Sequence, residues 1–264
     1  MTTSPLRGLR TAWMLLTRVP LPWPRRSPSA DGPAHEVRAA PAWFPLVGAA
    51  VGGLVAAVYV ALFDRVGAPT AAAIALGVGA LLTGALHQDG LADVADAFGG
   101  GWTVERRLEI LHDSRIGAYG TLALVGAFVV QTTALAQHDR AQGAAVLVAA
   151  HSMSRGGVVV LMRFAPRATD AGLGASFTRG LGTAATTGGA LSALALGTVA
   201  LGRLVPLAVS AVAVAVGLMG ALAWRKIRGI TGDVIGAAEQ LAETAVLVTG
   251  AALVRHVDAW PWWR

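Results

Sequence analysis

Long apolar runs constrain the fold of this chain more than any other feature of its sequence. Only 14% of its 264 residues are charged and 55% are hydrophobic, whereas soluble domains average about 25% charged residues. Several runs approach the roughly 20 apolar residues that a helix needs to cross a bilayer. The sequence therefore predicts an all-α, polytopic integral membrane protein that forms a single membrane-embedded domain over residues 1–264.

The apolar pattern predicts about seven spans, and six to eight are compatible with it. They cover residues 44–63, 69–87, 118–137, 141–162, 184–202, 204–224 and 234–254. Ahead of them, residues 5–19 place Leu6, Leu9, Trp13 and Leu16 at helical spacing among basic residues. This pattern predicts an amphipathic helix in the membrane interface, so the lipid bilayer is an expected partner.

Basic residues concentrate in the segments between alternate spans. Residues 1–43, 88–117, 163–183 and 225–233 carry most of them, and basic loops tend to face the cytoplasm. We therefore expect a multi-pass protein of the cell (inner) membrane, with a cytoplasmic N-terminal segment at 1–43 and a cytoplasmic acidic loop at 88–117. These loops explain the net charge of +6, so nucleic acid is not an expected partner. Zero cysteines exclude disulfides and thiolate metal sites.

Three aspartates in the 88–117 segment give the clearest chemical signal. Asp89, Asp93 and Asp96 are spaced at i, i+4 and i+7, so a helix projects all three from one face. Carboxylates so close repel one another unless a cation or protons lie between them, and oxygen ligands suit Mg²⁺ together with substrate phosphates. The spacing predicts a Mg²⁺ site. The alternative is a solvated acidic loop at the membrane surface.

Other polar residues are expected at the same membrane face. Asp113 and Arg115 belong to a second charged cluster. Gly99 and Gly100 either offer backbone N–H groups to a phosphate or form a flexible hinge. Arg155 lies inside the fourth predicted span and needs a partner there. That partner is either a substrate phosphate or an acidic side chain in a structural ion pair.

A third acidic group begins just before the seventh predicted span. Thr231 and Asp233 precede Glu239 and Glu243, which are four residues apart on one helix face and could lie opposite the aspartates. His87 lies two residues before the first aspartate. On a continuous helix it points away from the aspartate face, and it is a candidate general base if the helix ends there.

One block of the sequence strongly resembles a known family. The runs HQDGLADVADAFGG, at residues 87–100, and ERRLEILHDSRIGAYGTLAL, at 105–124, are similar to the signature of the cobalamin synthases, also called adenosylcobinamide-GDP ribazoletransferases. Weaker family-like segments recur in order near residues 17–22, 44–48, 151–155, 172–174 and 226–243. The resemblance implies an integral membrane, Mg²⁺-dependent transferase that performs the last joining step of the cobalamin nucleotide loop.

The implied reaction joins adenosylcobinamide-GDP to α-ribazole, or to its 5′-phosphate, and releases GMP with adenosylcobalamin or its phosphate. We expect the three aspartates to hold Mg²⁺, with Gly99, Gly100, Thr231 and Asp233 as further contacts to the metal and phosphate group. Asp113 or Glu239 would accept the hydroxyl proton. Arg115 or Arg155 would offset the charge of the transition state. Other cobalamin-assembly enzymes are conceivable partners, and the oligomeric state is open.

Two rival functions share part of this pattern. A CDP-alcohol phosphatidyltransferase-like enzyme also uses clustered aspartates in a membrane, but its signature needs Asp-Gly-x-x-Ala-Arg. Here Ala92 is followed by Asp93. A cation-coupled transporter would use intramembrane carboxylates, often within inverted repeats. The sequence has no convincing repeat, and its acidic residues cluster at one membrane face.

Overall fold

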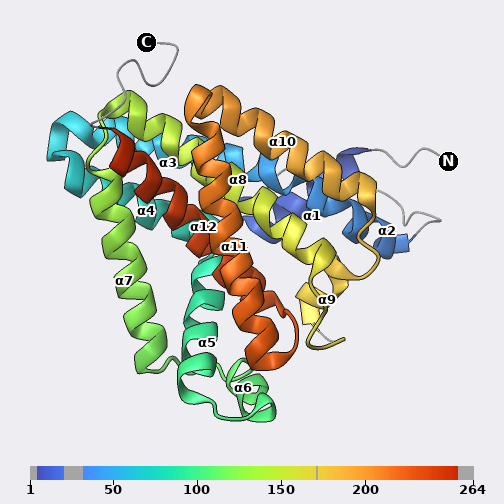
Figure 1. Cartoon of the computed structure of the whole chain (residues 1–264). Helices are drawn as coiled ribbons and strands as arrows, with labels where there is room; N and C mark the ends of the chain where they lie inside the picture. Colours follow the sequence, from blue (N-terminus) through green and yellow to red (C-terminus); the bar gives the residue numbers. More distant parts are fainter. Residues whose placement is uncertain (1–4, 21–31, 171, 255–264) are drawn as a thin grey trace.

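The computed structural model describes residues 5–20, 32–170 and 172–254, and within them the chain is built from helices (Figure 1). Parts of the predicted N-terminal segment 1–43 lie outside these residues. The helices are α1 (Pro5–Leu16), α2 (Gly32–Ala39), α3 (Phe44–Val66), α4 (Ala68–Thr83), α5 (Leu86–Gly100), α6 (Val104–Ile110), α7 (Ala118–Leu135), α8 (Arg140–Phe164), α9 (Gly172–Thr178), α10 (Thr183–Leu201), α11 (Val205–Ile227) and α12 (Gly232–Leu253). Short 3₁₀ turns precede α3 and α11.

Each predicted span overlaps a helix, although residues 69–87 run past the end of α4 into α5. The all-α membrane class is confirmed. Four helical stretches are long and apolar enough to cross a membrane: Glu36–Val66, Ala118–Leu135, Arg140–Phe164 and the α10–α11 run Thr183–Ile227. A fifth arises if α4 and α5 count as one broken span. The seventh predicted span falls on α12, which is not among these stretches because its acidic residues lower its hydropathy. The predicted number of seven spans is therefore not confirmed.

Local sequence signals explain where several helices begin. Asp139 accepts hydrogen bonds from the backbone N–H groups of Ala141 and Gln142, which caps α8. Thr231 caps α12 by accepting from Val234 N at 3.3 Å. Proline occupies the first turn of α3, α4 and α11, where its missing N–H costs nothing. These caps fix the ends of the two helices that carry the buried polar residues.

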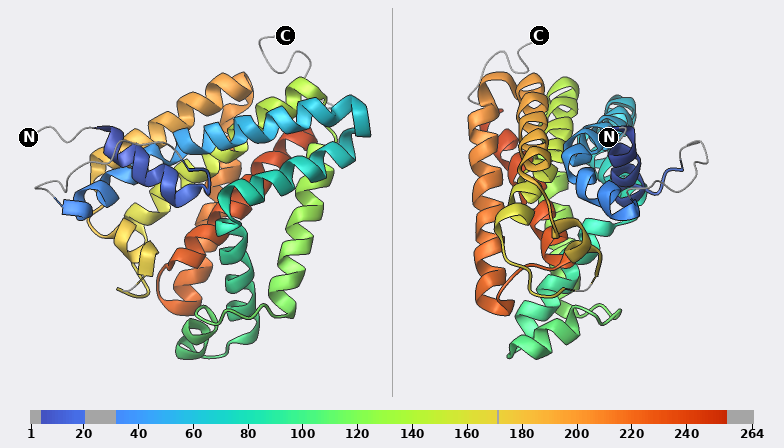
Figure 2. Two further views of the ribbon diagram at one scale, coloured as in Figure 1. Left: turned by 180° about the vertical axis from the view of Figure 1, so that it is seen from behind. Right: turned by 90° about the vertical axis from the view of Figure 1, so that its right-hand side faces the viewer.

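Helix α8 is the centre of the molecule, and 83% of its most apolar window is buried. It packs against α3, α10 and α12 (Figure 2). Small residues allow the closest crossing, since a Cβ atom at Gly48 of α3 would overlap the carbonyl oxygen of His151 on α8. By contrast, only 22% of the α7 window is buried. One face of α7 is thus free to meet lipid.

A sharp bend separates α4 from α5 and sets the position of the aspartate helix. The two axes differ by 92°, and the turn is made by Gly84 and Ala85, with φ of 65° and 55°. The bend directs α5 along α12. A Cβ atom at Gly90 would lie 2.7 Å from the carbonyl oxygen of Asp233. The first turns of α5 and α12 are therefore in direct backbone contact.

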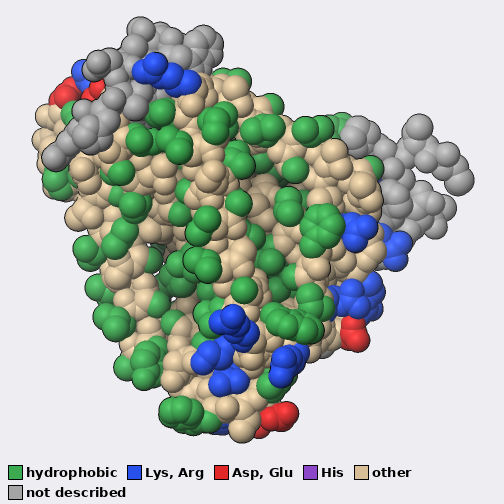
Figure 3. Space-filling view, in the orientation of Figure 1, with side chains coloured by type: hydrophobic (Ala, Val, Ile, Leu, Met, Phe, Trp, Pro, Cys, Tyr) green, Lys and Arg blue, Asp and Glu red, His purple; other side chains and the backbone are tan. Residues whose placement is uncertain are grey.

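The loops that were predicted to share one membrane face do meet in space. Ala168 N donates to Ile230 O at 3.0 Å, and Ile230 N donates to Pro166 O at 2.8 Å. Lys226 Nζ donates to the carbonyl of Phe98 at 3.2 Å. In Figure 3, Lys and Arg side chains gather over the lower end of α11 and towards α9, whereas the broad face above them is nearly free of charge. This distribution is the one expected of a protein that presents one basic end to water.

Candidate active site

Five ionisable side chains meet in the buried contact between α5, α8 and α12. Arg155 Nη1 lies 2.7 Å from Glu239 Oε1 and 3.7 Å from Glu243 Oε2. His87 Nδ1 lies 3.2 Å from Glu239 Oε2, and His151 Nδ1 hydrogen-bonds Glu243. None of these side chains is more than 8% exposed. We call these five residues the buried polar cluster.

Neutral groups complete the hydrogen bonding of the buried polar cluster. Ser154 Oγ donates to Glu239 at 2.9 Å, and Gln240 Nε2 donates to the same carboxylate at 3.0 Å. Arg155 Nη1 also donates to the carbonyl of His151 at 2.8 Å. A buried charge needs partners of this kind. The intramembrane arginine is therefore held by acidic side chains, which is the structural alternative foreseen for it.

A cavity of about 330 Å³ opens at the end where the loops meet, and we call it the loop-side cavity. Its polar lining includes Asp89 at the start of α5 and Thr231 and Asp233 at the start of α12. His112 adds an imidazole that lies within electrostatic reach of Asp233. The remaining walls come from α1, α8 and α9, including glycines 172 and 174. Segments distant in sequence thus converge on one cavity, which has charged groups set in a mostly apolar wall.

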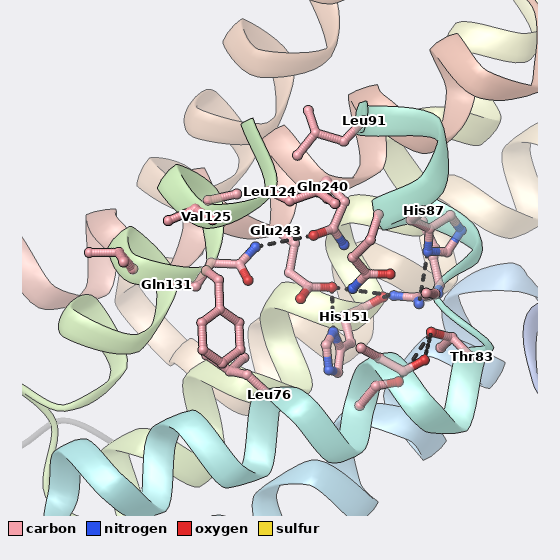
Figure 4. A pocket seen from close by; sticks show the side chains of 18 residues that line it. Leu76, Thr83, His87, Leu91, Leu124, Val125, Gln131, His151, Gln240 and Glu243 are labelled. Carbon is pink, nitrogen blue, oxygen red and sulfur yellow. Dashed lines mark hydrogen bonds and ion pairs between the residues drawn. The ribbon is translucent and has the colours of Figure 1, made fainter. Parts of the chain in front are cut away.

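A second cavity of about 420 Å³ lies between α4, α5, α7, α8 and α12, and we call it the lateral cavity (Figure 4). Most of its wall is apolar, and Glu243, Gln131 and Gln240 supply polar groups. His87 and Arg155 line both this cavity and the loop-side cavity. These two side chains therefore form a wall that both cavities share.

The three predicted metal-binding aspartates share α5 but have different surroundings. Asp89 is exposed at the loop-side cavity. Asp93 lies within electrostatic reach of Asp89, Asp96 and Asp233. Asp96 accepts hydrogen bonds from Gly117 N at 2.7 Å and Gly120 N at 2.9 Å. It therefore caps the first turn of α7, a contact that the sequence reading missed.

The carboxylates of Asp89, Asp93 and Asp233 fit a hard cation by donor type. In the described parts of the chain, no three His, Asp or Glu side chains lie close enough to hold one metal ion by themselves. Mg²⁺ usually needs only one or two carboxylates, because waters and substrate phosphates complete its shell. Burial raises the pKa of Asp233 above its usual range, and the nearby Asp89 carboxylate raises it further. A cation beside Asp233 would offset this by favouring its charged form.

Asp113 and Arg115 bind each other rather than the cavities. Arg115 Nη2 donates to Asp113 Oδ2 at 2.7 Å, and Arg115 Nε donates to Oδ1 at 3.0 Å. The Arg115 hydrogen bonds lower the pKa of Asp113 to about 2. Neither residue lines the loop-side or the lateral cavity. A carboxylate this acidic is a weak general base, so the structure argues against that role for Asp113.

Gly99 and Gly100 do not form the predicted phosphate-binding turn. They are the last two residues of α5, where helical hydrogen bonds use the backbone N–H groups. A helix C-terminus presents carbonyl oxygens and a negative partial charge, which disfavours a phosphate. Thr231 and Asp233 do lie at a cavity, as expected, and the Thr231 hydroxyl also bonds Asp233 Oδ2 at 3.2 Å.

Comparison with known proteins identifies the family of this chain. Residues 8–251 match the family described as cobalamin-5-phosphate synthase. The chain belongs to the cobalamin-5-phosphate synthase family. Similar proteins named adenosylcobinamide-GDP ribazoletransferase occur in Bradyrhizobium diazoefficiens, 41% identical over 94% of both chains, and in Chlorobaculum tepidum, 37% identical over 93% of this chain and 95% of the relative. A Ralstonia nicotianae protein of the same name is 38% identical over 90% of this chain and 93% of its own length. No solved structure gave a significant match.

Sequence reasoning missed two histidines of this cobalamin-5-phosphate synthase family member. His151 is part of the buried polar cluster, and His112 lines the loop-side cavity. For His151 a signal was present, because it precedes Arg155 by four residues and so shares its helix face. For His112 there was none, because its neighbours in space come from α12. The structure does bring together four of the predicted site residues, namely His87, Arg155, Glu239 and Glu243.

Proposed function

We propose that this chain is an adenosylcobinamide-GDP ribazoletransferase. The observation that carries the proposal is the family match over residues 8–251, together with relatives of that name that cover nearly the whole chain. The acceptor is α-ribazole or its 5′-phosphate, and the products are adenosylcobalamin, or its phosphate, and GMP. This is a phosphotransferase reaction, and it suits a cavity at which carboxylates, imidazoles and a guanidinium meet.

In the proposed step, a ribose hydroxyl oxygen of the acceptor attacks the phosphorus that is attached to the cobinamide side chain. A new O–P bond forms, the bond to the bridging pyrophosphate oxygen breaks, and GMP leaves. The loop-side cavity receives the pyrophosphate, with Asp89 and Asp233 on its wall. Asp89 and Asp233 are the two carboxylates on this wall that would hold Mg²⁺, with waters and phosphate oxygens as its other ligands, and Asp93 lies within electrostatic reach of both. Mg²⁺ when bound neutralises charge on the phosphate oxygens. Asp96, with two backbone partners, supports the position of α5 against α7.

His87 is the group that we assign to accept the hydroxyl proton. It lines both cavities, whereas Glu239 lines neither. Glu239 faces His87 Nδ1 at 3.2 Å, and this contact favours a neutral ring that carries its proton on Nδ1. Nε2 is then free to accept the proton of the attacking hydroxyl, as a carboxylate-oriented imidazole does in other enzymes.

Arg155 supplies positive charge at the wall between the cavities. Its guanidinium is 3.5 Å from His87 Nδ1 and is held in place by Glu239. A preorganised cation at a buried site stabilises developing negative charge without reorganisation. Arg115 is 86% exposed and pairs with Asp113, so we assign it no part in the step.

The active site faces the cytoplasm in this proposal, and the protein lies in the cell membrane. Support comes from the basic residues of the loops that surround the loop-side cavity and from the positive-inside tendency of membrane proteins. Cytoplasmic nucleotides and other cobalamin-assembly enzymes would then have direct access to the cavity.

The deciding experiment is GMP release by the purified protein in liposomes. Adenosylcobinamide-GDP and α-ribazole are supplied with Mg²⁺, with EDTA, and with EDTA followed by excess Mg²⁺. We expect release that requires α-ribazole, stops with EDTA and returns with Mg²⁺. Asp89→Asn should abolish it, whereas Asp64→Asn, at the exposed Arg140 pair, should not. A folded, Mg²⁺-replete protein that releases no GMP would contradict the proposal, and CDP-alcohol substrates and ion transport would be tested next.

A further inference from the structure

The lateral cavity has a polar inner end with unused hydrogen-bonding atoms. Three buried atoms of its lining residues lack a hydrogen-bond partner within the described residues: His151 Nε2, Arg155 Nε and Gln88 Oε1. His151 is 5% exposed and Arg155 is 2% exposed. A buried polar atom left unpaired costs about 1–3 kcal/mol. Three of them at one cavity of about 420 Å³, a size typical of small-molecule sites, point to a missing ligand.

The three atoms define the hydrogen bonds that this ligand must make. His151 Nδ1 hydrogen-bonds the Glu243 carboxylate, so in the neutral ring Nε2 is an acceptor. The Gln88 oxygen is also an acceptor, and Arg155 Nε is a donor. Figure 4 shows the His151 ring on the α4 side of Glu243, within the cavity. Two acceptors beside one donor suit the hydroxyl groups of a sugar, which both donate and accept.

The rest of the cavity suits an apolar, flat group. Leu76, Leu91, Leu124 and Phe128 line it from α4, α5 and α7. On the α7 side, Val125 is 56% exposed, so the cavity reaches the lipid-facing surface. A lipid acyl chain would match these walls but would leave all three polar atoms unpaired. A nucleoside with an apolar aromatic base matches both ends.

We propose that the lateral cavity is the binding site of the acceptor nucleoside. Its benzimidazole base lies among the apolar side chains of α4, α5 and α7, and its ribose lies against His151, Gln88 and Arg155. This inference rests on the proposed function, which supplies the identity of the acceptor as α-ribazole.

The shared wall explains how two substrates would meet. His87 and Arg155 line both cavities, so a ribose in the lateral cavity and a pyrophosphate in the loop-side cavity approach them from opposite sides. Phosphoryl transfer requires the attacking and leaving oxygens to be roughly in line with the phosphorus. Approach to His87 and Arg155 from two different cavities is compatible with this requirement, and it gives the acceptor a route that the bulky corrinoid does not block.

The first test measures α-ribazole binding directly, by equilibrium dialysis against the full-length protein in detergent. Ala127→Trp fills the lateral cavity from α7, and Leu122→Trp puts the same bulk on the same helix at a side chain that is 70% exposed and lines neither cavity. We expect Ala127→Trp to weaken binding by about tenfold or more. Leu122→Trp should stay within about twofold of the unmodified protein.

The second test does not depend on a bulky substitution. Because the chain contains no cysteine, Ala127→Cys and Leu122→Cys each introduce a single thiol. α-Ribazole should slow the reaction of the first thiol with a small methanethiosulfonate reagent and leave the second unaffected. Unweakened binding in Ala127→Trp, or no protection of the Ala127→Cys thiol, would overturn the inference. If the inference fails in this way but the unmodified protein still binds α-ribazole and releases GMP, the proposed function stands and only the place of the acceptor site is wrong. If the unmodified protein does neither, the proposed function itself fails.

Discussion

Arg155 of α8 and Glu239 of α12 form an ion pair, with 2.7 Å between Nη1 and Oε1, in which the side chains are only 2% and 0% exposed. The pair connects the central helix to the helix that begins at the loop-side cavity. Since each charge is buried, each depends on the other for its compensation. Loss of either partner therefore leaves the other charge buried without its compensation.

The structural consequence is a large loss of stability when one partner is removed. Arg155→Met leaves Glu239 as a buried carboxylate without its cationic partner, and the free energy of unfolding should fall by about 3–5 kcal/mol. The double variant Arg155→Met/Glu239→Gln should recover much of this loss. Denaturant unfolding in detergent, followed by circular dichroism, measures both.

The control for this prediction is an exposed pair. Arg106 and Glu109 are 2.9 Å apart but more than 60% exposed, so Arg106→Ala should cost less than about 1 kcal/mol. Additive losses in the double variant would mean that the buried residues are not coupled.

The sequence predicted the helices well because long apolar runs and proline starts are local signals. It placed Asp89, Asp93 and Asp96 on one helix for the same reason. It did not predict the 92° bend after α4, because residues 69–87 read as one uninterrupted apolar run. The left-handed Gly84 ends α4 with local hydrogen bonds, but the direction in which the chain leaves the turn also involves tertiary contacts, including one between Arg18 N and Leu82 O at 2.7 Å.

The site was only partly predictable for a related reason. The charge of each residue can be read from the sequence, but the sequence does not show which residue is its partner in space. Asp96 and Asp113 carry the same carboxylate as Asp89, yet one caps a helix 21 residues away and the other pairs with Arg115. The Asp96 contact is set by packing between α5 and α7, and the Asp113 contact by the conformation of the loop after α6. Neither spacing nor helical periodicity contains that information.

Because Asp96 and Asp89 have different contacts, their substitution should have different effects. Asp96→Ala removes the acceptor for two backbone N–H groups at the start of α7, so it should cost about 0.5–2 kcal/mol of stability, as the loss of a helix cap does. Asp89→Ala should leave stability nearly unchanged and abolish GMP release, because Asp89 is exposed at the cavity. Unfolding and activity are measured on both variants. The assignment is wrong if the Asp89 variant is the less stable of the two.

The Asp113–Arg115 pair predicts an unchanged pH profile. The pKa of Asp113 is about 2 in the folded state, against about 3.9 when unfolded. The pair's contribution to folding stability is therefore complete at pH values above about 3.9 and disappears as the pH falls towards 2. Within the working pH range, Asp113 stays ionised and does not titrate. Asp113→Asn should therefore keep the acid limb of the kcat/KM profile.

The size of the effect separates Asp113 from the assigned base. Removal of a general base lowers the catalytic rate by about 10²–10⁴-fold, and Asp113→Asn should lower it far less. His87→Ala should show a loss of that size. The reverse ranking would return the role of base to Asp113.

The left-handed Ala85 predicts a stabilising substitution. Ala85 has φ of 55° and follows Gly84, with φ of 65°, and a left-handed conformation costs roughly 1–2 kcal/mol in any residue with a Cβ atom. Glycine pays no such cost, so Ala85→Gly should raise the free energy of unfolding or leave it unchanged. The matched change Ala73→Gly, in the interior of α4, should lower it by about 1 kcal/mol. Denaturant unfolding measures the change in the free energy of unfolding for both variants. Changes of opposite sign would establish that the bend between α4 and α5 stores strain, whereas equal losses in both variants would mean that it does not.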